Sequence, residues 1–530
     1  MDTVTSSGGM VVAPHKAAAD AGAEILRDGG SAIEAMIAAA STIAVVYPHM
    51  NAIGGDGFWL IAEHGKDPKA LMACGGAGSG ASIKAYNDAG YEYVPTRGPL
   101  AALTVAGTVA GWDLALEAAK RLGKGKTPRR DLLAAAVRYA KEGIVVSKSQ
   151  AELTTQKLPE LAPQPGFANV FLLDGKPPQE GDLLKQERLA DTLEHLGLEG
   201  FVEFYKGDVG ASIAADLEQI GSPVTRADLG RFEARFKEAL KVQLKMGTIF
   251  NAPLPTQGLA SLIILALFDR LSIRDASCPE YVHALVEATK RAFLVRDRLV
   301  TDPAYAPESP RHYLKEKWLD SEAAKISLHR ALEWPTAPSA GDTIWMGAVD
   351  KSGLSVSFIQ SIYWEFGSGC VLPQTGITWQ NRGSSFSLRP DALNALAPGR
   401  LPFHTLNPAM ARMVDGRTVT YGTMGGEGQP QTQAAIYSRH IMFSQSVGAA
   451  IDAPRWLLGR TWGDETAALR LENRFDPDTL RYLEKAGHNV VVLDEDYSDT
   501  MGHAGMIVRN SRGGLEGAHD PRADGGAAIA

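Results

Sequence analysis

Thr343 lies where the chain changes from linker to strand, and its hydroxyl suits it to nucleophilic chemistry. Residues 334–342 before it are rich in Pro, Ala, Ser and Gly, a composition typical of an exposed linker. Residues 343–361 after it alternate with period two around a short turn and predict a β-hairpin. Cleavage between Asp342 and Thr343 would give one residue a hydroxyl and a free α-amine, which titrates near pH 7.7–8.0 and can act as its base. The alternative is a strand-edge Thr after an ordinary loop.

Two glycine-rich stretches could bind an anion or a cofactor. Gly425 and Gly426 precede an expected helix, and their backbone N–H groups could converge as in an oxyanion hole. A tight turn between strand and helix is the alternative. Residues 76–81 match G-x-G-x-x-A, which is weak evidence for a dinucleotide site because no convincing βαβ unit surrounds it. The chain lacks a G-x-S-x-G elbow, a P-loop and an H-E-x-x-H helix, which argues against α/β-hydrolases, NTPases and zinc peptidases.

The elements that must position these residues follow from periodicity and capping signals. Ser31 and Glu34 form an S-x-x-E capping box, and the helix it opens, up to about Val46, is apolar nearly all round and expected to be buried. We expect β-rich structure from 343 onward and a mainly helical region over 100–245. The other expected elements are helices at 14–28 (opening on Pro14), 281–299, 431–448 and 477–486, and a strand at 58–62.

Composition indicates an ordinary soluble enzyme. The chain has 530 residues, of which 45% are hydrophobic and 22% charged, and a net charge of −8, so it has no electrostatic footprint for nucleic acid or anionic lipid. Cys74, Cys278 and Cys370 are few and far apart, which favours reduced thiols over disulfides or a zinc site. No secretory signal is evident, and the most apolar run, 259–268, is too short to span a bilayer. A cytoplasmic location is expected.

Taken together, these motifs resemble the γ-glutamyltranspeptidase family of Thr-type N-terminal nucleophile hydrolases over almost the whole chain. The resemblance implies an α/β four-layer αββα sandwich, cut once into a large chain of residues 1–342 and a small chain of residues 343–530 that share one core. It implies no metal or organic cofactor. The matching stretches are 18–32, 53–58, 105–111, 225–229, the Asp342–Thr343 junction with its hairpin, Gly425–Gly426 and 520–522.

The same resemblance assigns catalytic roles. Thr343 matches the nucleophile, and Ser361 falls where the family has a second hydroxyl residue, usually Thr, that hydrogen-bonds it. A Ser in place of Thr keeps a hydroxyl that both donates and accepts. Gly425 and Gly426 match the backbone oxyanion hole.

The sequence departs from the family pattern at positions where glutamyl-cleaving members bind their substrate. Glutamyl-cleaving members hold the α-carboxylate with an early Arg, but here no Arg lies between Arg27 and Arg97. The acidic residue that holds the α-amine is replaced by Ser385, a Ser-Ser pair by His404–Thr405, and an Asn by Tyr363. Losing two charge-assisted contacts of about 1.5–3 kcal/mol each should remove most glutamyl affinity.

The rebuilt pattern is similar to the oxamate amidohydrolase branch, which splits oxamate into oxalate and ammonia in purine and urate breakdown. Arg382 could pair with a small carboxylate, and His404 and Thr405 could complete the pocket. A surface Arg and a satisfied core His are the alternatives. A γ-glutamyl hydrolase or transpeptidase, and an unprocessed binding protein, remain the rival functions. The sequence leaves open whether the protein is a homo-oligomer.

Overall fold

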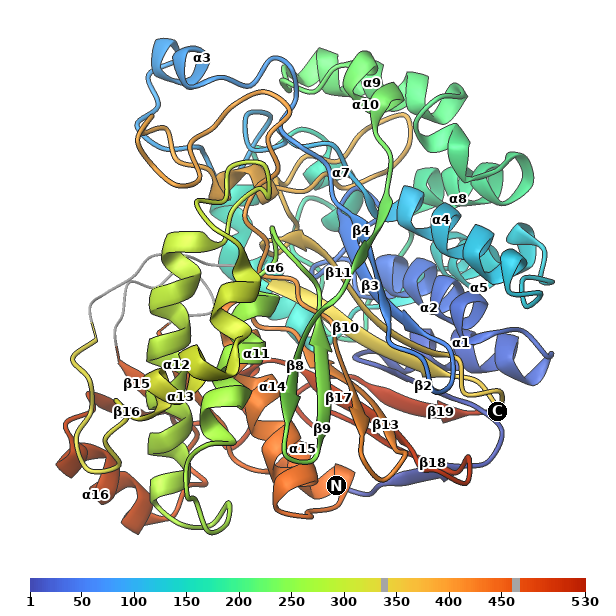
Figure 1. Cartoon of the computed structure of the whole chain (residues 1–530). Coiled ribbons are helices and arrows are strands. Elements are labelled where there is room, and N and C mark those ends of the chain that lie inside the picture. The colour runs from blue at the N-terminus through green and yellow to red at the C-terminus, as the bar shows by residue number, and fades with distance from the viewer. Residues whose placement is uncertain (335–341, 460–467) are drawn as a thin grey trace.

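The computed structural model describes residues 1–334, 342–459 and 468–530, and two seven-stranded antiparallel sheets form its centre (Figure 1). The first sheet has the order β1 (Val4–Ser6), β18 (Leu515–His519), β17 (Ala504–Arg509), β13 (Thr418–Thr423), β12 (Ala409–Met413), β9 (Gly247–Asn251) and β8 (Leu240–Leu244). The second has the order β19 (Gly526–Ile529), β2 (Met10–Ala13), β10 (Asp342–Val349), β11 (Ser355–Tyr363), β3 (Asp56–Ala62), β4 (Lys69–Ala73) and β7 (Arg235–Glu238). Each sheet therefore combines strands from both sides of the Asp342–Thr343 bond.

Helices cover the outer faces of both sheets. On the second sheet, α1 (Lys16–Arg27) packs on β2 and β19, and α2 (Ala32–Val46) packs on β10 and β11. On the first sheet, α11 (Gly258–Phe268) packs on β8 and β9, and α14 (Gln429–Tyr437) packs on β13. The two groups stand at opposite sides of the molecule in Figure 1, with the sheets between them.

The remaining elements surround this sandwich. The helices are α3 (Ile83–Asp88), α4 (Thr108–Arg121), α5 (Arg129–Glu142), α6 (Lys148–Leu161), α7 (Phe167–Phe171), α8 (Glu187–Glu199), α9 (Asp208–Ile220), α10 (Arg226–Arg231), α12 (Glu280–Leu299), α13 (Glu316–Ala323), α15 (Val447–Asp452) and α16 (Pro477–Ala486). Two small sheets contain β14 (Trp456–Leu458), β15 (Leu469–Leu471) and β16 (Val490–Val492), and β5 (Ile144–Val145) and β6 (Leu183–Leu184).

Strand β10 shows why the sheets stack. Ile344 and Met346 belong to the cluster that the second sheet forms with its helices, whereas Trp345 and Val349 belong to the cluster between the two sheets. Because successive side chains of a strand point to opposite faces, one alternating apolar strand supplies two separate cores. The expected αββα sandwich is confirmed.

Several expected elements are confirmed. Ser31 Oγ accepts from the Glu34 backbone at 3.3 Å, and a Glu34 carboxylate oxygen accepts from the Ser31 backbone at 2.7 Å, which completes the capping box. Every residue of α2 is buried, as its all-round apolar sequence predicts. The hairpin after residue 342 is the pair β10–β11, whose turn is closed by the Asp350 carboxylate.

Three expectations are wrong in detail. The first helix opens on His15, whose Nδ1 accepts from Ala17 N at 3.2 Å, and not on Pro14. The end of the predicted helical region, 235–244, is strand, because residues 240–244 alternate between buried and exposed. The predicted helix 431–448 is broken: α14 ends at Tyr437, a π-turn follows, and Ser444 with φ of 56° separates it from α15.

Most of the predicted linker, residues 335–341, lies outside the described residues. None of the helices in the described ranges combines the length and apolar character that crossing a bilayer requires.

Candidate active site

Three neighbouring strands bring Asp56, Ser361 and Thr343 to the same end of the second sheet. Ser361 of β11 is the register partner of Asp56 of β3. On the other side of β11, Asp342 pairs with Tyr363 and Ile344 with Gln360, so Thr343 lies at an irregularity opposite residues 361–362. Thr343 and Ser361 are both buried. Strand pairing alone therefore places the two hydroxyl residues beside each other.

Tyr363 connects Ser361 to the expected substrate residues. Its backbone N–H donates to Ser361 Oγ at 2.8 Å. Its φ of 85° is rare for a bulky residue, and such backbone conformations cluster at functional sites. The Tyr363 ring lies under the Arg382 guanidinium, with Cζ 3.9 Å from the ring centre. The irregular end of β11 thus turns an aromatic face toward a buried cation.

Arg382 is fully buried, so the surface alternative for this residue is wrong. Nη1 donates to Thr405 Oγ1 at 3.3 Å, whereas Nε and Nη2 have no hydrogen-bond partner among the described residues. Burial lowers the pKa of Arg382 to about 10, which leaves it charged at neutral pH. A buried guanidinium with two unused N–H groups is what a carboxylate fork needs.

His404 is buried edge-on against Phe58, with ring centres 4.8 Å apart. Neither of its ring nitrogens has a hydrogen-bond partner among the residues described, so it is not the satisfied core His considered above. Its Nε2 lies 3.7 Å from Asp56 Oδ2. Burial, assisted by the Arg382 charge, holds the pKa of His404 well below its usual range, so the imidazole is neutral.

Asp56 is a site residue that we did not predict. Its Oδ1 accepts from Gly107 N at 3.0 Å and Gly75 N at 3.4 Å, and its Oδ2 has no partner within the described ranges. Burial raises the pKa of Asp56 to about 7. The sequence feature that could have indicated Asp56 is its place at the head of the apolar strand 56–62, because a buried carboxylate is costly.

Gly425 and Gly426 follow β13 and have φ of 113° and 50°, conformations that favour glycine. Gln257, which the sequence did not single out, connects them to His404 and Thr405. Its Nε2 donates to the carbonyls of Thr405 and Gly426, both at 2.8 Å, and its backbone N–H donates to the His404 carbonyl at 2.9 Å. The expected oxyanion glycines and the expected substrate residues therefore belong to one connected group.

Other residues of interest have structural partners. Ser385 Oγ donates to the carbonyls of Arg382 and Phe403 at 3.0 and 3.3 Å. Arg97 donates to the Glu365 and Gly367 carbonyls, both at 2.6 Å, and thereby fixes the chain after β11. Residues 76–81 follow β4, which is antiparallel to both its neighbours, so they are not part of a βαβ unit.

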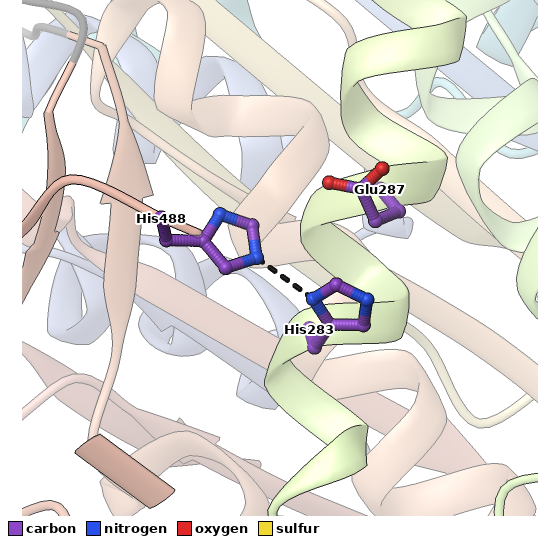
Figure 2. A group of neighbouring side chains, drawn as sticks. All are labelled: His283, Glu287 and His488. Atoms are coloured by element: carbon purple, nitrogen blue, oxygen red, sulfur yellow. Dashed lines mark hydrogen bonds between the residues drawn. The ribbon is translucent and has the colours of Figure 1, made fainter. Parts of the chain in front are cut away.

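Within the described part of the chain, one group of three side chains could hold a metal ion: His283, Glu287 and His488 (Figure 2). Its ligand atoms are already paired. His283 Nδ1 and His488 Nε2 share a hydrogen bond of 2.8 Å, and Glu287 accepts from Lys290 Nζ at 2.8 Å and from Leu332 N at 2.9 Å. The group holds α12 against the segment that leads into the linker, which is a structural role.

An αββα sandwich with a buried Thr at the head of a central strand defines the class of N-terminal nucleophile amide hydrolases. Comparisons identify the family within that class. The family model for gamma-glutamyltranspeptidase matches residues 18–530, so the chain belongs to the gamma-glutamyltranspeptidase family.

Three relatives illustrate the range of that family. The oxamate amidohydrolase proenzyme of Klebsiella pneumoniae is 52% identical over 99% of this chain and 98% of its own length. The glutathione hydrolase-like YwrD proenzyme of Bacillus subtilis is 39% identical over 98% of both chains. The crystal structure of a cephalosporin acylase from Bacillus halodurans superimposes with a TM-score of 0.91 at 31% identity, covering 100% of this chain and 97% of the other. The fold is therefore shared by relatives whose names give different acyl groups.

Proposed function

We propose that this chain is a precursor that cuts itself between Asp342 and Thr343 and then hydrolyses a small amide acid, with oxamate as the substrate that fits best. Residues 1–342 and 343–530 are then the large and small chains of the mature enzyme. Because each central sheet takes strands from both segments, the two chains remain together after the cut. The relatives named as proenzymes support a precursor.

The observation that carries the substrate proposal is the pair of unused N–H groups on buried Arg382. A desolvated cation is costly unless a counter-charge hydrogen-bonds it, and within the described residues no carboxylate bonds Nε or Nη2. A carboxylate placed against Nε and Nη2 would supply that charge, with the Thr405 hydroxyl and the neutral His404 ring beside it. Oxamate has one carboxylate and no ammonium group, so a single cation is enough to hold it.

Apart from the substrate and water, the proposed reaction uses only groups of the chain. Thr343 Oγ forms a bond to the amide carbon while its α-amine takes the hydroxyl proton. N–H groups of Gly425 and Gly426 bind the oxyanion, and Ser361 orients the Thr343 hydroxyl. The C–N bond then breaks, ammonia leaves with the proton from the α-ammonium, and water attacks the Thr ester to release oxalate.

Substrate competition tests this proposal. The purified mature enzyme should release ammonia from oxamate with a kcat/KM at least about 100-fold above that for a γ-glutamyl anilide, or roughly 2.7 kcal/mol of transition-state binding. The 52% identity to an oxamate amidohydrolase proenzyme supports this order. If the anilide is the better substrate, the enzyme is a γ-glutamyl hydrolase or transpeptidase and the oxamate assignment is wrong.

A further inference from the structure

The two oxygens of the Asp56 carboxylate have different surroundings: Oδ1 is bonded to the backbone, and Oδ2 faces His404. Oδ1 accepts from two backbone N–H groups, those of Gly75 and Gly107, which fix the side chain in one orientation. Oδ2 has no partner among the described residues and lies 3.7 Å from His404 Nε2. Since Asp56 is the register partner of Ser361, this oxygen lies one strand away from the second hydroxyl of the site.

Asp56 and the α-amine that cleavage would give Thr343 both change charge near neutral pH, whereas the groups that follow do not. Arg382 stays charged, and the pKa of His404 is held far below neutrality. Burial raises the pKa of the Cys74 thiol and of the Tyr205 phenol, so both are neutral. Before any ligand enters, Arg382 is therefore charged and His404, Cys74 and Tyr205 are neutral.

Because the charges of Arg382 and Asp56 interact, a small monoanionic acid that binds Arg382 brings a second carboxylate within the electrostatic range of Asp56. Two carboxylates that share a site cannot both stay ionised easily, and one of them takes up a proton. Burial has already raised the pKa of Asp56 to about 7, so protonating it costs little at neutral pH.

We propose that Asp56 takes up one proton from solvent when a small carboxylate binds beside Arg382, and that its Oδ2–H then donates a hydrogen bond to the ligand. This inference rests on the proposed function, because it needs a carboxylate substrate. It makes Asp56 a specificity-determining residue. The protonated acid stabilises a second carboxylate at the site, whereas the ionised acid would repel it and favour an ammonium group.

Calorimetry of the mature enzyme with pyruvate tests the inference, since pyruvate carries a methyl group where oxamate carries its amide nitrogen. Titrations in two buffers of different ionisation enthalpy count the protons taken up on binding. With a pKa of about 7, Asp56 should take up about 0.9 proton per site at pH 8 and about 0.1 at pH 6, in addition to any uptake by the Thr343 α-amine. The pyruvate dissociation constant should rise by up to about tenfold per pH unit above pH 7.

Asp56→Asn is the matched variant, because its amide keeps an oxygen for Gly75 and Gly107 and can present an N–H group in place of Oδ2. At pH 8 this variant should take up about 0.9 proton fewer than the parent on binding pyruvate, and any uptake by the Thr343 α-amine should remain. Asp302→Asn is the control: Asp302 is also buried, but its two oxygens accept from Ala304 N and Leu401 N. It should keep the parental proton uptake.

The outcomes separate the two proposals. Oxamate turnover and pyruvate binding with equal proton uptake in the parent and in Asp56→Asn would overturn the role of Asp56 and leave the proposed function standing. If the mature enzyme neither turns over oxamate nor binds pyruvate, the proposed function fails, and the inference about Asp56 fails with it.

Discussion

Replacing Arg382 tests the proposed substrate site, and the hydrogen bonds that Arg382 can offer set the expected loss of kcat/KM. Arg382→Ala removes Nε and Nη2, the two N–H groups that have no partner among the described residues. A hydrogen bond to a charged group contributes about 1.5–3 kcal/mol, and the two bonds of one fork are not fully additive. We therefore expect a loss of about 2–4 kcal/mol of transition-state binding, or roughly 30- to 1,000-fold in kcat/KM for oxamate. Arg382→Lys keeps the charge but loses the fork, so its loss should be intermediate.

Ammonia release from oxamate by each purified variant gives the measurement, and intact mass shows whether the variant has cut itself. Self-cleavage should persist in Arg382→Ala, because the Asp342–Thr343 bond needs no substrate carboxylate. Arg400→Lys is the matched control: Arg400 is also buried, but its guanidinium donates to Thr301 and to the carbonyls of Leu393 and Ala395. It should keep the parental kcat/KM. A correctly processed Arg382→Ala enzyme with parental kcat/KM would refute the assignment.

Three further predictions concern the surrounding groups. Ser361→Ala should slow turnover, and with it self-cleavage, by roughly 10²–10⁴-fold if Ser361 shares in proton handling; unchanged rates for both would make it a plain strand residue. Asp56 has a folded-state pKa of about 7 against 3.8 in the unfolded chain, so its ionisation lowers the stability of the fold progressively between pH 3.8 and 7, fully above pH 7 and not at all below pH 3.8. In an uncut Thr343→Ala background, Asp56→Asn should therefore raise the unfolding free energy by up to about 4 kcal/mol at pH 8 and leave it unchanged near pH 3.5; equal changes at both pH values would contradict the assignment. His488→Ala should cost about 1–3 kcal/mol in denaturant unfolding, because His283 Nδ1 loses its hydrogen-bond partner; parental stability would contradict the structural role.

The sequence predicted correctly those elements that have one clear periodicity or a clear capping motif. The Ser31–Glu34 box and the β10–β11 hairpin are confirmed for that reason. Residues 235–244 form strands and not the predicted helix. Charged residues among the apolar ones, after a long helical region, make the period-two alternation hard to recognise. The helix expected over 431–448 is interrupted near Ser444, which has a left-handed backbone conformation. No proline or glycine precedes it within that range to indicate a helix end.

The candidate site was predicted in part. Motifs pointed to Thr343, Ser361, Arg382, His404 and Thr405, and contacts or strand pairing bring these residues to one region, although their roles stay predictions. The sequence analysis did not assign Asp56 or Gln257 to the site, because their importance depends on long-range burial and hydrogen bonding. A carboxylate becomes a proton acceptor near neutral pH only when the fold removes its water; the apolar strand 56–62 suggests this burial but does not place Asp56 beside His404.

Intact-mass spectrometry of the purified protein tests most directly the claim that Thr343 is a self-generated nucleophile. The account predicts two fragments, residues 1–342 and 343–530, with Thr343 as the first residue of the smaller one. It predicts a single uncut chain without amidase activity for Thr343→Ala. An uncut parent that hydrolyses oxamate, or a Thr343→Ala chain that is cut at the same bond, would contradict the claim.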